Sequence, residues 1–276
     1  MDLARVSDFS VLLVGDAIVD EYVYVDVIGK AVKDAALSST ILRREQFKGG
    51  VWAAARHVQG FCRRVDVLRG ADIMHNSRMV DAVYLRKLFT THELLPNDDD
   101  SHEYTIGDYD CVIVTDFGHG AMTDRLRERV MREARYLCVN TQTNAVNYGF
   151  NTIERYPHAD YVVLDELEAR LAARMRAAPI EDVILKLGRK HIVVTQGKNG
   201  ACGFDGVFER APAVAGAVTD TLGAGDAFLA VSSPYAAAGF SLRDLLRIGN
   251  AAGAAKVAIV GHSASVDRAA LEKYLG

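Results

Sequence analysis

Residues 111–140 read CVIVTDFGHGAMTDRLRERVMREARYLCVN and carry the pattern on which the fold prediction depends. The apolar run at 111–116 is typical of a buried strand, and the apolar spacing over 124–137 predicts an amphipathic helix. A second apolar run at 137–140 predicts the next strand. A strand, a helix and a strand in this order predict parallel strands in one sheet, with helices covering both faces.

The same alternation continues on both sides of this unit. Downstream, the pattern predicts strands at 161–165 and 191–197 and helices at 166–178, near 226–239 and near 243–260. Upstream, apolar runs at 10–14 and 65–68 predict strands, and an Ala-rich helix follows Gly49 and Gly50. No stretch resembles a linker or an internal repeat, so we expect one α/β domain over residues 1–276.

Two further strands do not fit this alternation. Residues 22–28 (YVYVDVI) and 37–47 (LSSTILRREQF) are extended in character and are separated by a polar turn. They predict a small, half-exposed β lid over about 21–30 and 36–47, which covers a site or pairs between subunits. An isolated hairpin of this kind is at best marginally stable, so we expect a homodimer. Residues 71–107 give no clear pattern.

The composition argues against several classes of protein. Half of the residues are hydrophobic, a quarter are charged and the net charge is −4, so the basic excess of a nucleic-acid binder is missing. No apolar run approaches the roughly 20 residues that span a bilayer. The four cysteines form no CxxC pair, which argues against a zinc site. The first residues lack the pattern of a signal peptide, and we expect a cytoplasmic protein.

Polar residues follow several of the predicted strands. Because ligands of open α/β sheets bind at the carboxyl ends of the strands, these side chains should converge on one edge. The alternative is that each is an ordinary turn or N-cap residue. The residues are Asp16, Asp20, Asp116, Asn140, Asp165 and Thr195.

Residues 220–228 (DTLGAGDAF) carry the strongest chemical signal. Gly223 and Gly225 let a ligand approach the backbone, and the free amides at a helix start attract an anion. Asp226 would lie in the first helical turn beside a bound phosphate, where a carboxylate accepts a proton from a nucleophilic hydroxyl. The alternative is an Asp that only stabilises the helix start.

This segment resembles the signature of the ribokinase (PfkB) family of carbohydrate kinases. Other segments resemble the family in the same order along nearly the whole chain: VLLVGDAIVDEYVYVDV, FKGG, VIVTDFGHG, the Thr195-x-Gly197-x-x-Gly200 spacing and Asn250-Ala-Ala-Gly. The resemblance implies a ribokinase-like three-layer α/β/α sandwich with a mainly parallel sheet and a small β lid. The GDAIVDEY and TDFGHG segments are most similar to kinases of D-glycero-D-manno-heptose 7-phosphate, which phosphorylate the anomeric hydroxyl.

The resemblance implies a role for each matching residue. Asp226 would be the catalytic base, and the amides of Ala224, Gly225 and Asp226 would form the anion hole, with Gly223 also in the catalytic segment. The implied sugar-binding residues are Asp16, Asp20, Gly49, Gly50 and Asp116. The implied nucleotide-binding residues are Thr195, Gly197, Gly200 and Asn250. Glu168, with Asp165, would organise Mg²⁺ through water. ATP would be the phosphoryl donor, and family members often use a monovalent cation near the anion hole.

Several positions depart from the family pattern. Asp165 stands in place of an Asn, Ala53 in place of an Asn that contacts the sugar, and His119 in place of a Lys. Asn140 replaces an acidic residue, and Pro234 lies within a predicted helix. Phosphoryl transfer to a sugar remains the leading hypothesis. The alternative is a sugar- or nucleotide-binding protein of the same fold with little turnover and a regulatory or assembly role.

Other kinase and nucleotide-binding classes lack their motifs here. The chain has no GxxxxGK[ST] segment of a P-loop NTPase, and GDAIVD after the first strand does not supply the GxGxxG of a Rossmann dehydrogenase. The signature segments of protein kinases are also missing.

Overall fold

The computed structural model describes residues 1–96, 104–214, 216, 219, 221–259 and 264–275. Within these residues, ten strands form one sheet in the order β10-β9-β8-β7-β6-β5-β1-β3-β4, with β2 paired to β1. The strands are β1 (Ser10–Lys30), β2 (Leu37–Gly50), β3 (Arg64–Asp81), β4 (Lys87–Pro96), β5 (Cys111–Asp116), β6 (Leu137–Thr141), β7 (Tyr161–Asp165), β8 (Ile192–Thr195), β9 (Ala201–Phe204) and β10 (Phe208–Ala211). The helices are α1 (Val51–Gln59), α2 (Asp124–Glu133), α3 (Glu166–Ala173), α4 (Ile180–Leu187), α5 (Ala224–Ala237), α6 (Leu242–Val257) and α7 (Arg268–Leu275).

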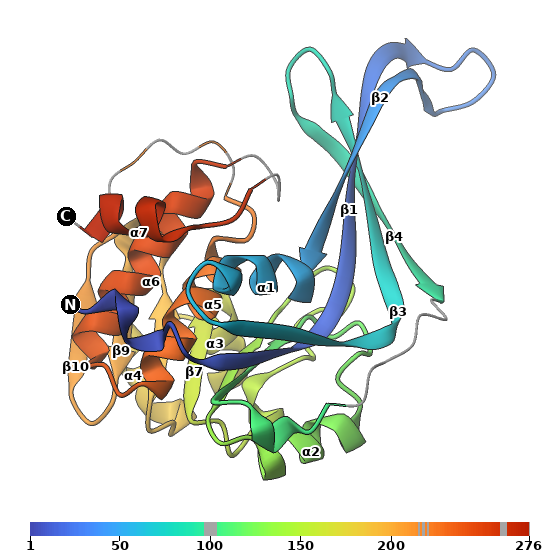
Figure 1. Ribbon diagram of the computed structural model, residues 1–276. Coiled ribbons are helices and arrows are strands. Elements are labelled where there is room, and N and C mark those ends of the chain that lie inside the picture. Colours follow the sequence, from blue (N-terminus) through green and yellow to red (C-terminus); the bar gives the residue numbers. More distant parts are fainter. Residues whose placement is uncertain (97–103, 215, 217–218, 220, 260–263, 276) are drawn as a thin grey trace.

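The central strands run parallel, as the alternation predicted. β3, β1, β5, β6, β7 and β8 pair in parallel, whereas β2, β4, β9 and β10 join antiparallel. Successive side chains of a strand point to opposite faces, so the sheet has two cores. Ile113 and Val163 pack on one face with α1, α5, α6 and α7, and Val112 and Val162 pack on the other with α2, α3 and α4. Figure 1 shows the resulting three layers, so the predicted fold class is confirmed.

The lid rises from one end of this sheet (Figure 1). β1 is one continuous strand: residues 11–15 pair with β5 and residues 10–15 with β3 in the body, and residues 17–30 pair with β2. Its register with β3 shifts between Gly15 and Ala17, at the border of body and lid. We define the lid as residues 17–30, β2, residues 72–81 of β3, and β4.

The two expected lid strands are present as parts of β1 and β2. The structure adds two more, because β3 continues into the lid and β4 pairs with it. Both lie in the stretch 71–107 that gave no sequence signal, and the part of that stretch at 97–103 lies outside the described residues.

Two helices end earlier than the sequence pattern indicates. α2 ends at Glu133, before the chain enters β6, and α3 ends at Ala173 because Arg174 adopts a left-handed conformation with φ 56°. Pro234 does lie inside α5, but three residues before its end. The missing backbone donor is therefore confined to the last turn, where Ser233 Oγ donates to the Leu229 carbonyl oxygen at 2.7 Å.

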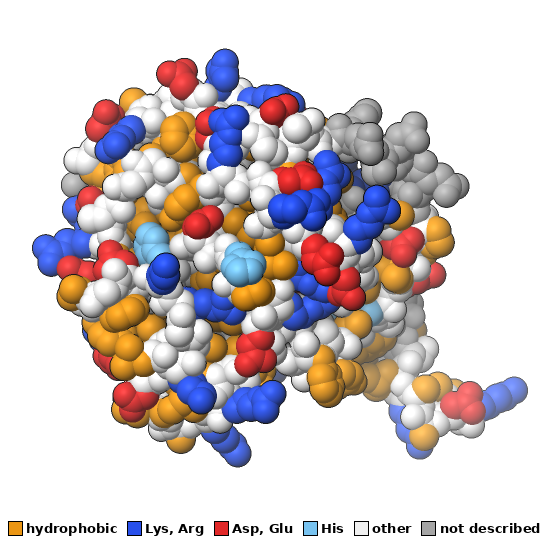
Figure 2. All heavy atoms as spheres, turned by 90° about the horizontal axis from the view of Figure 1, so that it is seen from below, with side chains coloured by type: hydrophobic (Ala, Val, Ile, Leu, Met, Phe, Trp, Pro, Cys, Tyr) orange, Lys and Arg blue, Asp and Glu red, His pale blue; other side chains and the backbone are white. Residues whose placement is uncertain are grey.

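Charged side chains of both signs are interspersed on the face of the molecule shown in Figure 2. Among the described residues, no helix has the length and apolar character needed to cross a bilayer.

Candidate active site

Two clefts meet at the start of α5. The lid cleft, of about 490 Å³, lies between the lid and the carboxyl ends of the central strands, and includes Asp20, Gly50, Glu168 and Asp226 in its lining. The α6 cleft, of about 660 Å³, runs along α6. The lining residues common to both are Thr195, Gly197, Thr221, Ala224 and Gly225. A ligand in each cleft would therefore face the other across the turn that precedes α5.

This turn has the geometry of an anion site. Gly223 is the N-cap of α5 with φ 77°, a left-handed conformation that favours glycine. The first amides of a helix have no acceptor within the helix, and here the Ala224 amide makes a long hydrogen bond of 3.5 Å to the Thr221 carbonyl oxygen, which an anion could replace. A Cβ atom added to Gly225 would meet no atom within 4 Å, so the space above this residue is open. Asp220, the first residue of the motif, lies outside the described residues.

Asp226 is buried in the first turn of α5, and its side chain lines the lid cleft. Gln142 Nε2 donates a hydrogen bond of 2.6 Å to Asp226 Oδ1. Burial raises the pKa of Asp226 to about 6, although the positive charge of Lys256 lowers it; the negative charge of Asp20 adds to the increase. A carboxyl with such a pKa is ionised near neutral pH and readily accepts a proton, as a general base must.

All four residues predicted to bind the nucleotide line the α6 cleft: Thr195, Gly197, Gly200 and Asn250. Gly200 has φ 86°, and a Cβ atom there would overlap the Ala211 carbonyl oxygen. Asn250 Nδ2 donates to the carbonyl oxygens of Ala211 and Pro212, at 3.2 and 2.9 Å. These hydrogen bonds hold α6 against the segment after β10 and so fix one wall of the cleft.

The lid supplies polar side chains that the sequence did not identify. Asp20, which was predicted, forms an ion pair with Arg78 of β3. Asn76 Oδ1 lies 2.7 Å from His92 Nδ1 of β4. All four side chains line the lid cleft, together with the predicted Gly50. The three new residues come from β3 and β4, the strands without a sequence signal.

Asp16 does not line the lid cleft. Its buried carboxylate accepts hydrogen bonds from the backbone amides of Phe117 (2.8 Å) and Ala121 (2.9 Å). It thereby holds the loop 117–121, whose Phe117 and His119 do line the cleft. Gly49 pairs with Ile18 at the base of the lid and is also not part of the lining. A direct sugar contact by either residue stays a prediction.

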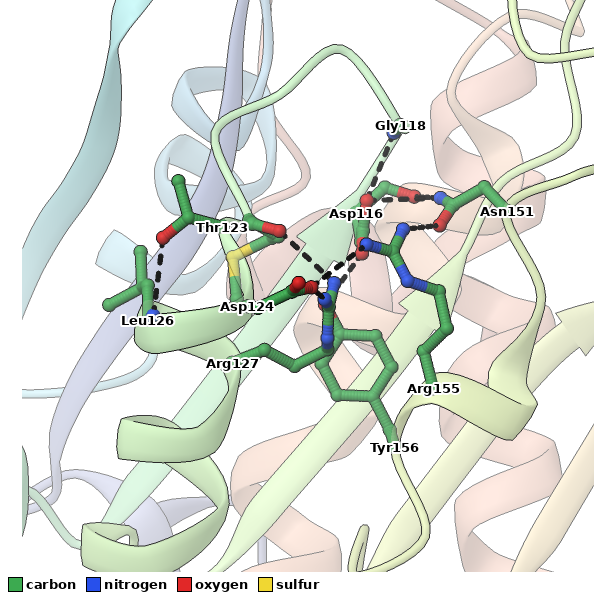
Figure 3. A network of polar contacts seen from close by, with 10 residues as sticks. Asp116, Gly118, Thr123, Asp124, Leu126, Arg127, Asn151, Arg155 and Tyr156 are labelled. Carbon is green, nitrogen blue, oxygen red and sulfur yellow. Dashed lines mark hydrogen bonds and ion pairs between the residues drawn. The ribbon is translucent and has the colours of Figure 1, made fainter.

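Asp116 lies below the same loop, at the centre of the network in Figure 3. Its carboxylate accepts hydrogen bonds from Tyr156 Oη (2.6 Å), Asn151 Nδ2 (3.0 Å) and the Gly118 amide (2.9 Å). Arg155 extends the network by donating to Asn151 Oδ1 at 2.8 Å. The structure thus gives Asp116 a role in positioning the loop, and its predicted sugar contact remains untested.

Asp165 and Glu168 meet at the start of α3 and line the lid cleft. They form a capping box: the Glu168 amide donates to Asp165 Oδ1 at 2.7 Å, and the Asp165 amide donates to Glu168 Oε2 at 2.8 Å. Asn140 Nδ2 also donates to Glu168, at 3.2 Å. Burial and the Asp165 carboxylate raise the pKa of Glu168 to about 8. Among the described residues, no three His, Cys, Asp or Glu side chains cluster as direct metal ligands.

Of the positions that depart from the family pattern, Asn140, Asp165 and His119 line the lid cleft, whereas Ala53 and Pro234 do not. His119 lines the lid cleft, and burial lowers its pKa, so it is neutral at pH 7. Ala53 is buried in the first turn of α1. Lys48 lies over the ring of the neighbouring Trp52, with 5.2 Å between Nζ and the ring centroid.

The model of the "pfkB family carbohydrate kinase" matches residues 87–269, more than half of the chain. The chain is 27% identical over 174 residues to the bifunctional protein HldE of Wolinella succinogenes. The aligned region covers 60% of this chain and 36% of HldE. HldE of Campylobacter curvus gives the same identity over 175 residues. The chain thus spans about a third of the length of these curated relatives.

Solved structures share the fold over almost the whole chain. The ribokinase of Thermotoga maritima has a TM-score of 0.74 at 16% identity, covering 97% of this chain and 99% of the other. Arabidopsis thaliana ribokinase, complexed with ribose and ATP, has a TM-score of 0.70 at 15% identity, with coverages of 97% and 99%. Phosphofructokinase-2 of Escherichia coli in complex with potassium has a TM-score of 0.69 at 14% identity, with coverages of 97% and 98%. The same enzyme is also known in a tetrameric inhibited form.

Proposed function

Because the chain belongs to the pfkB family of carbohydrate kinases, we propose that it transfers the γ-phosphoryl group of ATP to a hydroxyl of a sugar or sugar phosphate. One observation carries this proposal: Asp226 and the open amides at the start of α5 lie where the two clefts meet. A donor in the α6 cleft and an acceptor in the lid cleft would face each other there.

In the proposed reaction, each group has one step. The acceptor hydroxyl lies beside Asp226, whose ionised carboxylate takes the hydroxyl proton as the oxygen attacks the γ-phosphorus. The bond from phosphorus to the leaving oxygen of ADP breaks in the same transfer. The amides of Ala224, Gly225 and Asp226 stabilise the negative charge on the transferring group because they are fixed before the reaction begins.

Asp165 and Glu168 fit a hydrated magnesium ion that enters with the nucleotide. Their carboxylates share the cleft, and burial together with the Asp165 carboxylate raises the pKa of Glu168. Magnesium keeps several of its waters, so the two carboxylates need only accept hydrogen bonds from those waters. When bound, the ion would neutralise charge on the phosphates.

The lid favours a polar acceptor, and we propose a sugar phosphate such as heptose 7-phosphate. Asp20 and Asn76 present oxygen and amide groups that suit sugar hydroxyls, and Arg78 and His92 add donors for an anionic group. The likeness to HldE supports the same class of acceptor. Because Arg78 already pairs with Asp20, a phosphate would have to compete with that carboxylate.

The first test is ADP release with Mg-ATP across neutral sugars and sugar phosphates, including heptose 7-phosphate, with the product identified by mass spectrometry. Turnover with one phosphorylated acceptor supports the whole proposal. Turnover with a neutral sugar alone keeps the kinase and rejects the sugar-phosphate acceptor. Binding of ATP and sugar without turnover favours the alternative of a binding protein with the same fold.

Asp226→Asn tests the catalytic base. We expect the rate of transfer to fall by about 100- to 10,000-fold, the usual contribution of a general base, with little change in nucleotide affinity. Asp205→Asn, at an exposed turn between β9 and β10, is the matched control and should keep full activity. Full activity of the Asp226 variant would remove the residue from this role.

A further inference from the structure

The segment after β6 carries an asparagine, Asn147, whose partly buried side chain contacts two parts of the site. Asn147 Nδ2 donates hydrogen bonds to the carbonyl oxygens of Phe117 (3.0 Å) and Gln142 (2.7 Å). Its Oδ1 accepts hydrogen bonds from the backbone amides of Asn144 (3.2 Å) and Gly149 (3.0 Å). An amide side chain has two protons to donate and two lone pairs to accept with, so all four positions of this one are in use.

The first contact is with the loop 117–121, which forms a wall of the lid cleft. The Phe117 carbonyl oxygen also accepts a hydrogen bond of 2.7 Å from Asn144 Nδ2, so two side-chain amides hold it. At its far end the same segment reaches the start of this loop, where Asn151 Nδ2 donates to the carbonyl oxygen and to the carboxylate of Asp116 (Figure 3). The segment after β6 therefore sets the position of the loop.

The second contact is with the residue that binds the proposed base. The backbone of Gln142 is held on both sides, because its amide donates to the Asp116 carbonyl oxygen at 2.8 Å and its carbonyl oxygen accepts from Asn147. From this fixed backbone, Gln142 Nε2 donates to Asp226 Oδ1 at 2.6 Å. Asn147 thus joins the loop 117–121 to the residue that holds Asp226.

We propose that Asn147 is a positioning residue that fixes the loop 117–121 and the base Asp226 relative to each other, so that the acceptor hydroxyl meets the base in one geometry. The inference rests on the proposed function. The role requires an amide, because a carboxylate at this position would place negative charge against two carbonyl oxygens. Such positioning matters for rate, since a displacement of about 1 Å at a reacting centre can cost about 100-fold.

Two variants of the same kind isolate the contact with Gln142. Asn147→Asp keeps an oxygen for the amides of Asn144 and Gly149 but removes both donors. Asn144→Asp is the matched control. It adds the same charge in the same turn, keeps an oxygen for the amides of Val146 and Asn147, and also loses a donor to the Phe117 carbonyl oxygen. It differs in leaving the hydrogen bond from Asn147 to Gln142 in place.

The first measurement is the pKa of Asp226 in the ligand-free protein, by carbon-13 NMR of labelled Asp residues assigned with Asp226→Asn. Each variant is studied alone and together with Gln142→Leu. We expect Asn147→Asp to raise this pKa by about one unit alone, and by at least about half a unit less beside Gln142→Leu, because the hydrogen bond from Gln142 is then already lost. Asn144→Asp should give the same shift in both backgrounds. Equal shifts from Asn147→Asp in the two backgrounds would overturn the proposal.

The second measurement uses the acceptor that the ADP-release screen identifies. We expect both variants to raise the KM for this acceptor about three- to tenfold, the cost of one hydrogen bond, and to leave the KM for Mg-ATP within about twofold. Only Asn147→Asp should also move the rising limb of kcat/KM to higher pH by more than about half a unit. Equal increases in both KM values would mean a general disturbance of the fold and would contradict the inference.

These readouts separate this inference from the proposed function. The titration of Asp226 needs no substrate, so it tests Asn147 even if no acceptor is turned over and the kinase proposal fails. If Asn147→Asp does not fold, Asn147→Ala repeats the same comparison with Gln142→Leu without an added charge.

Discussion

At Asp226, burial and hydrogen bonding act on the pKa in opposite directions. The folded pKa of about 6 predicts that kcat/KM rises with pH up to about 6 and is level above it, because the base must be ionised. Gln142 favours the ionised form through its 2.6 Å hydrogen bond. We expect Gln142→Leu to move the rising limb to higher pH by about one unit, measured from kcat/KM profiles. If the rising limb of the profile stays at the same pH in this variant, it reflects the ionisation of a group other than Asp226.

Glu168 illustrates a cost in stability at the site. Its pKa is about 8 in the folded protein and 4.5 as an ordinary glutamate, so between these values the folded state holds a proton that the unfolded state lacks. Its contribution to the free energy of unfolding is therefore full below pH 4.5 and declines as the pH rises through about 8.

We expect Glu168→Gln to increase the free energy of unfolding by about 2–3 kcal/mol at pH 7, measured by urea denaturation. The gain should disappear below pH 4.5, where the wild-type carboxyl is also mostly neutral in the unfolded state. Phosphoryl transfer should fall, because the glutamine has no charge to offer a hydrated magnesium ion. Equal stability of the two proteins at pH 7 would contradict the raised pKa.

At the scale of elements, a substitution at the start of α5 should affect ligand binding without lowering the stability of the fold. A Cβ atom at Gly225 would meet nothing within 4 Å of the protein, and alanine favours helices over glycine. We expect Gly225→Ala to keep or raise the stability by up to about 1 kcal/mol, while its methyl group weakens Mg-ATP binding about tenfold or more. Thermal unfolding and calorimetry measure the two effects. Gly200→Ala is the contrasting variant, because its added Cβ overlaps the Ala211 carbonyl oxygen and should destabilise the protein.

The elements differ in how well the sequence predicted them. β5 and β7 are buried on both faces, so their apolar runs gave their bounds directly. β4 is exposed at almost every residue, and β3 passes from the body into the lid. Neither has the contrast between a buried and an exposed face that produces an alternating pattern.

The residues of the candidate site also differ in whether the sequence could identify them. The residues at the start of α5 and along the α6 cleft were identified from their motifs. Asn76, Arg78 and His92 were missed because they lie on β3 and β4, which have no motif and no periodicity. Lys256 was missed because a single lysine in an Ala-rich helix is usually a surface residue, and only the packing of α5 on α6 shows that it is buried.

At the scale of the whole molecule, the lid carries large exposed apolar side chains. Ile41 is 49% exposed and Phe89 57% exposed. Paired residues of neighbouring strands point to the same face of a sheet. Ile41 pairs with Val25 of β1, and Phe89 pairs with Met79, which in turn pairs with Val23 of β1. Val23 and Val25 are two residues apart on β1, so Ile41 and Phe89 lie on one face of the lid. We propose that a second copy of the chain covers this face.

Sedimentation equilibrium tests this assembly. We expect a dimer for the wild-type protein and a dissociation constant at least about 30-fold higher for Ile41→Asp with Phe89→Asp, because buried apolar anchors dominate interfaces. Val207→Asp, exposed in the turn between β9 and β10, should remain dimeric. A wild-type protein that stays monomeric at all concentrations would reject the dimer.

The continuous course of β1 limits how this protein could be re-engineered. Body and lid share one strand, with side-chain period two, so deleting a single residue before Asp16 would turn the inward side chains of either the body or the lid outward. The lid of a relative could therefore not replace this lid by itself, without the body strands that continue into it. A chimera that changes acceptor preference must exchange β1 and β3 together, along with their partners in the central sheet.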